Sequence, residues 1–192
     1  MSRVRVKVNR RFLPHRFLLS SALHHLETAT QKRDGYFYEW LGAILLSALS
    51  IEAISNSYGE ALVPDWKDFE SASSIAKLRL VATKCGISPD FSKHPWATAR
   101  LLKKFRDRIV HAKPKHLKLE KDCNESDYRE SFNALLQTNL EKMITQDFAT
   151  QSCDAVEQIL RALNKTLNES ELYELAYEGH TSHAALLKDG AA

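Results

Sequence analysis

The sequence predicts an all-α fold, a bundle of about five to seven helices with a short extended basic arm at the N-terminus. Apolar residues recur at helical spacing through most of the 192 residues, as in amphipathic helices. Only 6 glycines and 5 prolines interrupt the chain, so long helices can form. Strand periodicity occurs in one place, where Val4, Val6 and Val8 alternate with Arg5 and Lys7. We therefore expect helices packed on helices, without a central sheet.

Composition indicates one globular domain with a core of its own. Apolar residues make up 44% of the chain and charged residues 27%, both ordinary values for a soluble domain. We expect a basic arm over residues 1–11, a helical domain over residues 12–179 and a flexible tail over residues 180–192. The basic start lacks the apolar stretch of a secretion signal. Three scattered cysteines indicate reduced thiols, so the sequence favours a cytoplasmic protein.

Two helices are expected in the first third of the chain. Residues 12–30 have apolar positions at helical spacing, and Asp34-Gly35 then marks a turn. Residues 36–58 form the most apolar stretch, which predicts a buried central helix. We expect no membrane span here, because the apolar run is short and Glu52 interrupts it.

Glu52 is the exceptional residue of this central helix. A carboxylate among apolar side chains must be paired or must shift its pKa, so we expect Glu52 to be buried and hydrogen-bonded. Asn56 lies one turn further along the same side. Both are candidate supporting residues of a site. We favour a structural pair between Glu52 and an arginine over direct catalysis by Glu52.

Helical periodicity continues through the second half of the chain. A third helix is expected over residues 68–84, closed by Gly86, and an amphipathic helix over residues 97–113, ended by Pro114. The apolar stripe of this amphipathic helix consists of Thr98, Leu101, Leu102, Phe105 and Ile109. Further helices are expected over residues 126–145, 150–167 and 171–179.

The amphipathic helix carries the residues with the clearest chemistry. Arg106 lies at the edge of the apolar stripe, and Asp107 and His111 lie one turn apart on the polar face. Arginine offers a permanent charge suited to phosphate oxygens, and histidine exchanges a proton near neutral pH. Asp107 is placed to hold the histidine ring. Without a cluster of carboxylates, these residues suit metal-free RNA cleavage by the ribose 2′-OH.

The same residues form a motif. The run is Arg106-Asp107-Arg108-Ile109-Val110-His111. It resembles the Arg-polar-x-x-x-His signature of the HEPN superfamily (higher eukaryotes and prokaryotes nucleotide-binding domains). The central helix contains Ser50, Glu52, Ala53 and Asn56, which is similar to a Ser-x-Glu-Ala-x-x-Asn helix of HEPN-like proteins. The resemblance implies a HEPN-like helical bundle.

The resemblance also implies a mechanism and an assembly. Two protomers would form a homodimer whose motif helices meet and build one composite cleft. Arg106 would stabilise the phosphorane, His111 would act as general acid or base, and Asp107 would position them. No metal and no cofactor are implied, and the product would be a 2′,3′-cyclic phosphate. Such proteins often act in toxin–antitoxin or antiviral defence systems, so an antitoxin or other defence protein is an expected partner.

Positive charge gathers at the N-terminus and around the motif. Residues 1–16 carry six Lys or Arg and no acid, and residues 100–121 carry nine against two acids, whereas residues 122–179 carry four against twelve. A polyanion such as RNA is the partner that this distribution favours. The alternative is a solvated face. The residues expected to contact RNA phosphates are Lys103, Lys104, Arg108 and Lys113.

Two classes of function follow from the sequence. The first is a metal-independent HEPN-like endoribonuclease that acts by 2′-OH transesterification. The second is a non-catalytic HEPN-like module that binds RNA, a nucleotide or a protein. The basic arm would contact RNA or a partner chain in either class, or would be disordered. A purified protein that is inert on RNA would favour the second class.

Overall fold

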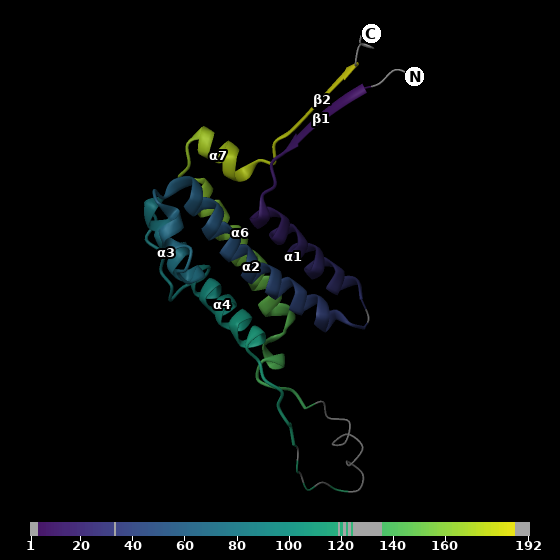
Figure 1. Cartoon of the computed structure of the whole chain (residues 1–192). Coiled ribbons are helices and arrows are strands. Elements are labelled where there is room, and N and C mark those ends of the chain that lie inside the picture. Colours follow the sequence, from purple (N-terminus) through teal and green to yellow (C-terminus); the bar gives the residue numbers. More distant parts are fainter. Residues whose placement is uncertain are drawn as a thin grey trace.

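The computed structural model of the chain describes residues 4–32, 34–118, 120, 122, 124 and 136–186. Figure 1 shows helices packed side by side, with two strands projecting from one end. The all-α character predicted from the sequence is confirmed for these residues. The elements, in chain order, are β1 (Val4–Arg10), α1 (Pro14–Gln31), α2 (Tyr36–Leu62), η1 (Trp66–Phe69), α3 (Ser74–Lys84), α4 (Trp96–Val110), η2 (Glu141–Met143), α6 (Gln146–Asn164), α7 (Glu169–Ala176) and β2 (His180–Leu186).

Helix α2 is the centre of the bundle, and α1, α3, α4 and α6 all pack against it (Figure 1). Its core-facing side buries Ile44, Ile51, Ile54 and Tyr58. With 27 residues, α2 is long and apolar enough to cross a membrane, so the expectation that it is too short is wrong. One such helix is weak evidence for a membrane span, because the core helix of a soluble protein passes the same test.

Helices α4 and α6 cover α2 with one-sided apolar faces. Leu102 and Phe105 of α4 are buried, and Phe105 meets Phe148 of α6 edge-on with ring centroids 5.8 Å apart. Leu101 is an exception to the predicted stripe, because it is turned about 100° from Leu102 and is 43% exposed. This packing leaves the polar side of α4 at the surface, where the motif residues lie.

Helix α3 begins at Ser74, later than the sequence predicts. The side chain of Ser73 caps it by accepting a hydrogen bond from the backbone N–H of Ala76 at 3.3 Å. The preceding residues form η1, whose Trp66 is buried against Gly59 of α2. The packing of this indole ring on α2 therefore explains why the residues before Ser74 do not form the first part of the predicted helix.

The arm is a two-stranded antiparallel sheet. Strands β1 and β2 pair in a register that runs from Val4 opposite Leu186 to Arg10 opposite His180. The arm is extended, as predicted, and points away from the helices (Figure 1). The loose tail expected over residues 180–192 is wrong for β2, because that segment forms ladder hydrogen bonds with β1. Residues after Leu186 lie outside the described part of the chain.

The helix expected over residues 126–145 is only partly covered, since residues 125–135 are outside the described part of the chain. Its second half does not form an α-helix and contains only η2. Thr138 and Glu141 explain this difference. The Glu141 side chain accepts from the backbone N–H of Thr138 at 2.7 Å, and the Thr138 hydroxyl accepts from the backbone N–H of Glu141 at 3.1 Å. These local bonds satisfy the backbone without a continuous helix.

Candidate active site

The candidate site lies at the C-terminal end of α4. The helix ends at Val110, and His111 is its C-cap residue, whose backbone N–H donates to the Asp107 carbonyl at 3.0 Å. Helical geometry therefore stops before the predicted end at residue 113, and Pro114 does not account for this, because a proline restricts only the residue directly before it, Lys113. The His111 side chain is exposed, so a bound molecule can reach its ring.

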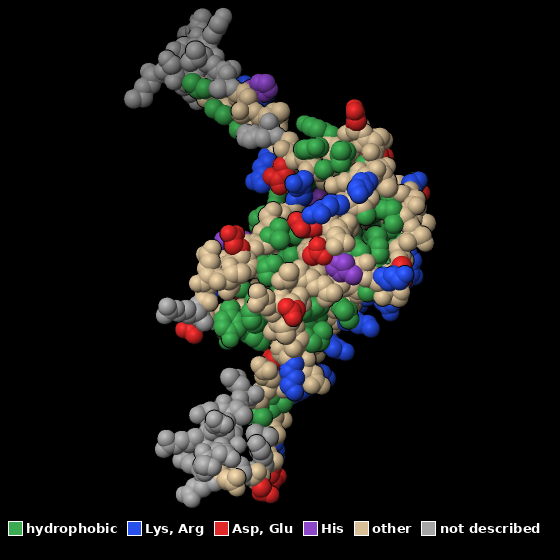
Figure 2. Space-filling model, turned by 180° about the vertical axis from the view of Figure 1, so that it is seen from behind, with side chains coloured by type: hydrophobic (Ala, Val, Ile, Leu, Met, Phe, Trp, Pro, Cys, Tyr) green, Lys and Arg blue, Asp and Glu red, His purple; other side chains and the backbone are tan. Residues whose placement is uncertain are grey.

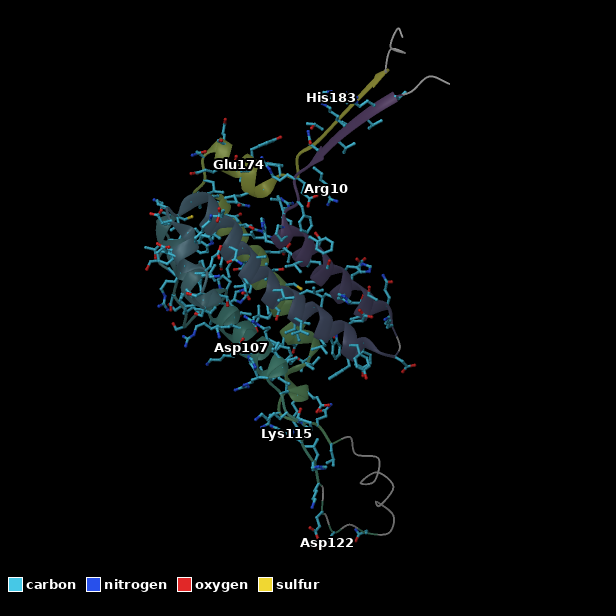
Figure 3. The ribbon with its side chains drawn as sticks, viewed as in Figure 1. Arg10, Asp107, Lys115, Asp122, Glu174 and His183 are labelled. Atoms are coloured by element: carbon cyan, nitrogen blue, oxygen red, sulfur yellow. The ribbon has the colours of Figure 1, made fainter. Side chains whose placement is uncertain are left out.

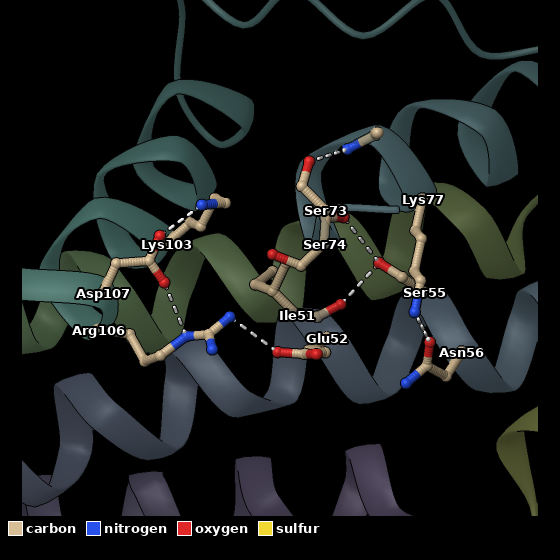
Figure 4. A network of polar contacts seen from close by, with 11 residues as sticks. Ile51, Glu52, Ser55, Asn56, Ser73, Ser74, Lys77, Lys103, Arg106 and Asp107 are labelled. Carbon is tan, nitrogen blue, oxygen red and sulfur yellow. Dashed lines mark hydrogen bonds and ion pairs between the residues drawn. The ribbon is translucent and has the colours of Figure 1, made fainter. Parts of the chain in front are cut away.

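Two carboxylates hold the guanidinium of Arg106 (Figure 4). Its Nη2 donates to Glu52 Oε2 of α2 at 3.0 Å, and its Nε lies 3.3 Å from Asp107 Oδ1 on its own helix. Lys103 pairs with the other oxygen of Asp107. These contacts form a series of alternating charges that connects α4 with α2, in the order Lys103, Asp107, Arg106 and Glu52. Arg106 provides the link between the two helices.

Glu52 pairs with an arginine, as expected, but it is not buried. Its side chain is 37% exposed and that of Arg106 is 29% exposed. Leu49, one turn before Glu52, is 41% exposed, and Asn56, one turn after it, is also exposed. The expectation of burial is wrong because this side of the apolar helix α2 faces solvent at the edge of α4. An ion pair this exposed contributes little to stability, so its main effect is to orient Arg106.

Asp107 is ionised and engaged with cations. The hydrogen bond from Lys103 is the main cause that lowers the pKa of Asp107 below its ordinary range, and the charges of Arg106 and His111 act in the same direction. Its carboxylate oxygens contact Lys103 and Arg106. Among the described residues, no hydrogen bond joins this carboxylate to the His111 ring, so the expectation that Asp107 holds the ring is wrong.

Asn56 belongs to a different contact (Figure 4). Its Oδ1 accepts a hydrogen bond from Lys77 Nζ of α3 at 3.0 Å. Lys77 is only 5% exposed, and its ammonium lies 5.9 Å from the centroid of the Trp66 ring. The sequence gives no sign of this lysine, because its partners come from separate elements. Asn56 therefore orients a buried lysine and not Arg106.

A groove of about 1120 Å³ opens beside the end of α4. His111, Arg108 and Lys113 line it, together with Thr138 and Glu141. Arg108 also donates to the Met143 sulfur at 3.7 Å. Figure 3 shows Asp107 and Lys115 near this end of the bundle. Arg106 does not line the groove, so the structure brings His111 together with the basic residues and leaves Arg106 beside Glu52.

The basic residues predicted to contact RNA differ in their surroundings. Lys104, Arg108 and Lys113 are exposed, whereas Lys103 is half-buried in its ion pair with Asp107. Figure 2 shows Lys and Arg side chains along one edge of the helical body. Three of the four predicted residues are therefore free to approach a phosphate.

The chemistry available at this site is charge stabilisation and proton transfer. Arg106 is an oriented cation, and His111 is an accessible acid or base. In the part of the chain that the structure describes, no three His, Cys, Asp or Glu side chains gather as a metal site requires. The chain matches no protein-family model, and comparisons with curated proteins and with solved structures give no match.

Proposed function

We propose that this protein is a metal-independent, HEPN-like endoribonuclease. A ribose 2′-OH attacks the neighbouring phosphorus, the bond to the 5′ oxygen of the next nucleotide breaks, and the product ends in a 2′,3′-cyclic phosphate. His111 moves the proton and Arg106 stabilises the charge on the phosphorane. Asp107 positions Arg106, since its carboxylate contacts that guanidinium.

The oriented guanidinium of Arg106 is the observation that carries this proposal. Glu52 and Asp107 contact it from two helices while leaving the side chain partly exposed. A cation that is already fixed before the substrate binds needs no reorganisation as charge develops in the transition state. A phosphorane is the kind of species that such a cation stabilises, because arginine matches phosphate oxygens with its planar fork.

We also propose that two copies complete the site. Arg106 and His111 are about 140° apart around a helix axis, so one chain presents them on different sides. In a homodimer, His111 of one copy would lie beside Arg106 of the other. Leu49, 41% exposed, and Val110, 63% exposed, lie one turn from Glu52 and Arg106 and offer apolar surface for this contact.

The proposed setting follows from the resemblance and, for the cytoplasm, from the three scattered cysteines. The protein would act in the cytoplasm, without a membrane, in a toxin–antitoxin or antiviral defence system. An antitoxin or other defence protein would neutralise it by covering the groove. RNA would lie in that groove, where Lys113 and Arg108 supply phosphate contacts.

A non-catalytic binding module is the second candidate function. A general acid or base is usually oriented by a second group, and no side-chain hydrogen bond to the His111 ring is found among the described residues. The groove and its cations would then hold RNA, a nucleotide or a protein without cleaving it.

The test is cleavage of end-labelled RNA by the full-length protein in excess chelator, followed by analysis of the product ends. We expect fragments with 2′,3′-cyclic phosphate ends. His111→Ala should lower the rate about 10²–10⁴-fold. His116→Ala removes another exposed histidine from the following segment and should cleave like wild type.

Three outcomes would contradict the endoribonuclease proposal. The first is intact RNA, with binding retained, which favours the binding module. The second is cleavage that the chelator abolishes. The third is equal cleavage by wild type and His111→Ala. The homodimer is tested separately by sedimentation, where a monomer at high concentration would contradict the composite site.

A further inference from the structure

A second pocket lies at the end of the bundle nearest the arm. Its volume is about 270 Å³, and residues of α1, α2, α6 and α7 line it. Figure 3 shows Arg10 and Glu174 at this end of the molecule and Asp107 toward the other end. None of its lining residues lines the groove at His111, so it is separate from the candidate active site.

Two buried polar side chains form the floor of this pocket. His15 and Tyr58 are both fully buried, with their rings 5.7 Å apart. His15 Nε2 lies 3.0 Å from the Leu175 carbonyl and Nδ1 lies 3.3 Å from the Ser57 hydroxyl. The Tyr58 hydroxyl donates to Asn164 Oδ1. Burial lowers the pKa of His15 and raises that of Tyr58, so both are neutral at pH 7.

The rim of the pocket is rich in hydrogen-bond donors. Arg16 and Ser20 of α1 and Arg161 of α6 all line the pocket. The fixed role of Asn164 Oδ1 as an acceptor leaves its amide nitrogen to donate. A pocket with convergent polar groups, neutral buried titratable residues and partly apolar walls has the properties of a ligand site.

Acceptors in the same pocket are already occupied. The Leu175 carbonyl accepts from His15, the Ala176 carbonyl accepts from Arg16, and the Glu157 carboxylate lies 3.5 Å from Arg161. The same contacts use only one N–H of Arg16 and one side of Arg161, so each guanidinium keeps further donors for a ligand, beside the Ser20 hydroxyl and the Asn164 amide. Donors of this kind bind phosphate and carboxylate oxygens.

We propose that this pocket binds a small organic anion, a phosphate monoester or a carboxylate that carries an apolar group. Arg16 and Arg161 contact the anionic oxygens from two sides. The apolar group lies against Leu19, Leu23 and Leu160, which form the apolar part of the wall. The volume matches a small molecule of this kind.

The test is calorimetric titration of the full-length protein with four probes at constant ionic strength. Phenyl phosphate and benzoate share an apolar ring and differ in the anion, inorganic phosphate lacks the ring, and benzyl alcohol lacks the charge. We expect saturable binding of at least one ring-bearing anion, with a Kd of about 1 mM or tighter. Whichever anion binds tighter identifies the class of natural ligand.

Substitutions in the pocket and next to it test whether the anion binds at this place. Arg161→Ala removes an exposed side chain and should weaken binding at least about tenfold. Ser20→Ala removes one rim donor with little effect on folding and should weaken binding less. Lys165→Ala, one turn further along the chain from Arg161, removes the same charge outside the pocket and should bind like wild type.

The proposal is overturned if neither ring-bearing anion binds, if benzyl alcohol binds as tightly as the anions, or if Arg161→Ala binds as tightly as wild type. It is also overturned if Lys165→Ala loses as much affinity as Arg161→Ala, because that result means general charge attraction. RNA cleavage by the same variants is measured in parallel. An absence of cleavage would contradict the endoribonuclease proposal and would not affect the proposal of an anion pocket.

Discussion

The guanidinium of Arg106 contacts both Glu52 and Asp107, so a substitution of Arg106 removes both contacts. Arg106→Ala removes the cation that the proposed reaction requires, so we expect RNA cleavage to fall about 10²–10³-fold. Because the side chains of the Arg106–Glu52 pair are 29% and 37% exposed, the free energy of unfolding should fall by no more than about 1 kcal/mol. Cleavage kinetics and urea unfolding of the same preparation measure the two effects.

Glu52→Gln removes the negative charge of this side chain but keeps an oxygen in nearly the same position. The amide oxygen still accepts from Arg106, so cleavage should fall less than in Arg106→Ala.

Arg100→Ala is the matched control for Arg106→Ala, because it removes another arginine of α4 away from the Glu52 pair. Equal losses in Arg100→Ala and Arg106→Ala would contradict a specific role for Arg106.

His15 makes stability depend on pH. Burial is the main cause that lowers the pKa of His15 below its ordinary value of 6.5; the charge of Arg16 lowers it further, and the hydrogen bond to the Leu175 carbonyl opposes both. The unfolded chain therefore takes up a proton here at a higher pH than the folded chain. The stabilising contribution of neutral His15 is complete above its unfolded pKa, and it is lost as the pH falls below that value.

We expect His15→Asn to flatten this dependence. Urea unfolding at about pH 7.5 and about pH 5.5 gives the change in free energy of unfolding for each variant. His24→Asn changes an exposed histidine of the same helix and should keep the wild-type difference. A pH difference that His15→Asn leaves unchanged would contradict this role for His15.

At the scale of elements, the contact between α2 and η1 depends on one glycine. A Cβ atom at Gly59 would clash with the indole ring of Trp66, which is buried against it. Gly59→Ala should therefore destabilise the protein by about 1–3 kcal/mol, although alanine favours a helix. Thermal or urea unfolding measures the loss. Trp66→Leu in the Gly59→Ala background should remove the clash, so a double variant that regains no stability would contradict this explanation.

Local periodicity predicts the helices, but it does not predict contacts between distant segments. The helices over residues 12–30 and 36–58 are found close to their predicted bounds, because their apolar residues repeat at helical spacing. The start of α3 and the existence of β2 depend on partners elsewhere in the chain. Trp66 packs on α2, and β2 finds its hydrogen-bond partners in β1 at the opposite end of the sequence.

For the candidate site, too, the sequence predicts the positions of residues along a helix but not their contacts across helices. The positions of Arg106 and His111 late on one helix follow from the sequence, as does an arginine partner for Glu52. The sequence does not show that this partner is Arg106 itself, nor that Lys77 is the partner of Asn56. Side-chain partners across helices depend on packing angle and register, which a single sequence does not contain.

At the scale of the whole molecule, the asymmetric charge predicts how RNA binding responds to salt. Lys104, Arg108 and Lys113 are exposed around the groove and the outer side of α4, so bound RNA would release counterions from each phosphate they neutralise. We expect the logarithm of the affinity to fall linearly with the logarithm of salt concentration. Lys113→Ala should make this slope about one unit shallower.

Filter binding or fluorescence anisotropy over a range of salt concentrations measures the slope. Lys165→Ala removes one positive charge from the C-terminal end of α6 and should leave the slope unchanged. Lys103→Ala should alter the slope less than Lys113→Ala, because Lys103 already pairs with Asp107. An affinity that does not vary with salt would mean that the basic edge is only a solvated surface.

Because Val4 lies opposite Leu186, both ends of the described chain leave the molecule at the tip of the arm. A mechanical force applied across these ends acts along the ladder hydrogen bonds, which lie perpendicular to antiparallel strands. The strands should then open like a zipper, one residue pair at a time, before any load reaches the helices. In a single-molecule pulling experiment, we expect a first lengthening of about 45 Å at low force, ahead of cooperative unfolding of the bundle.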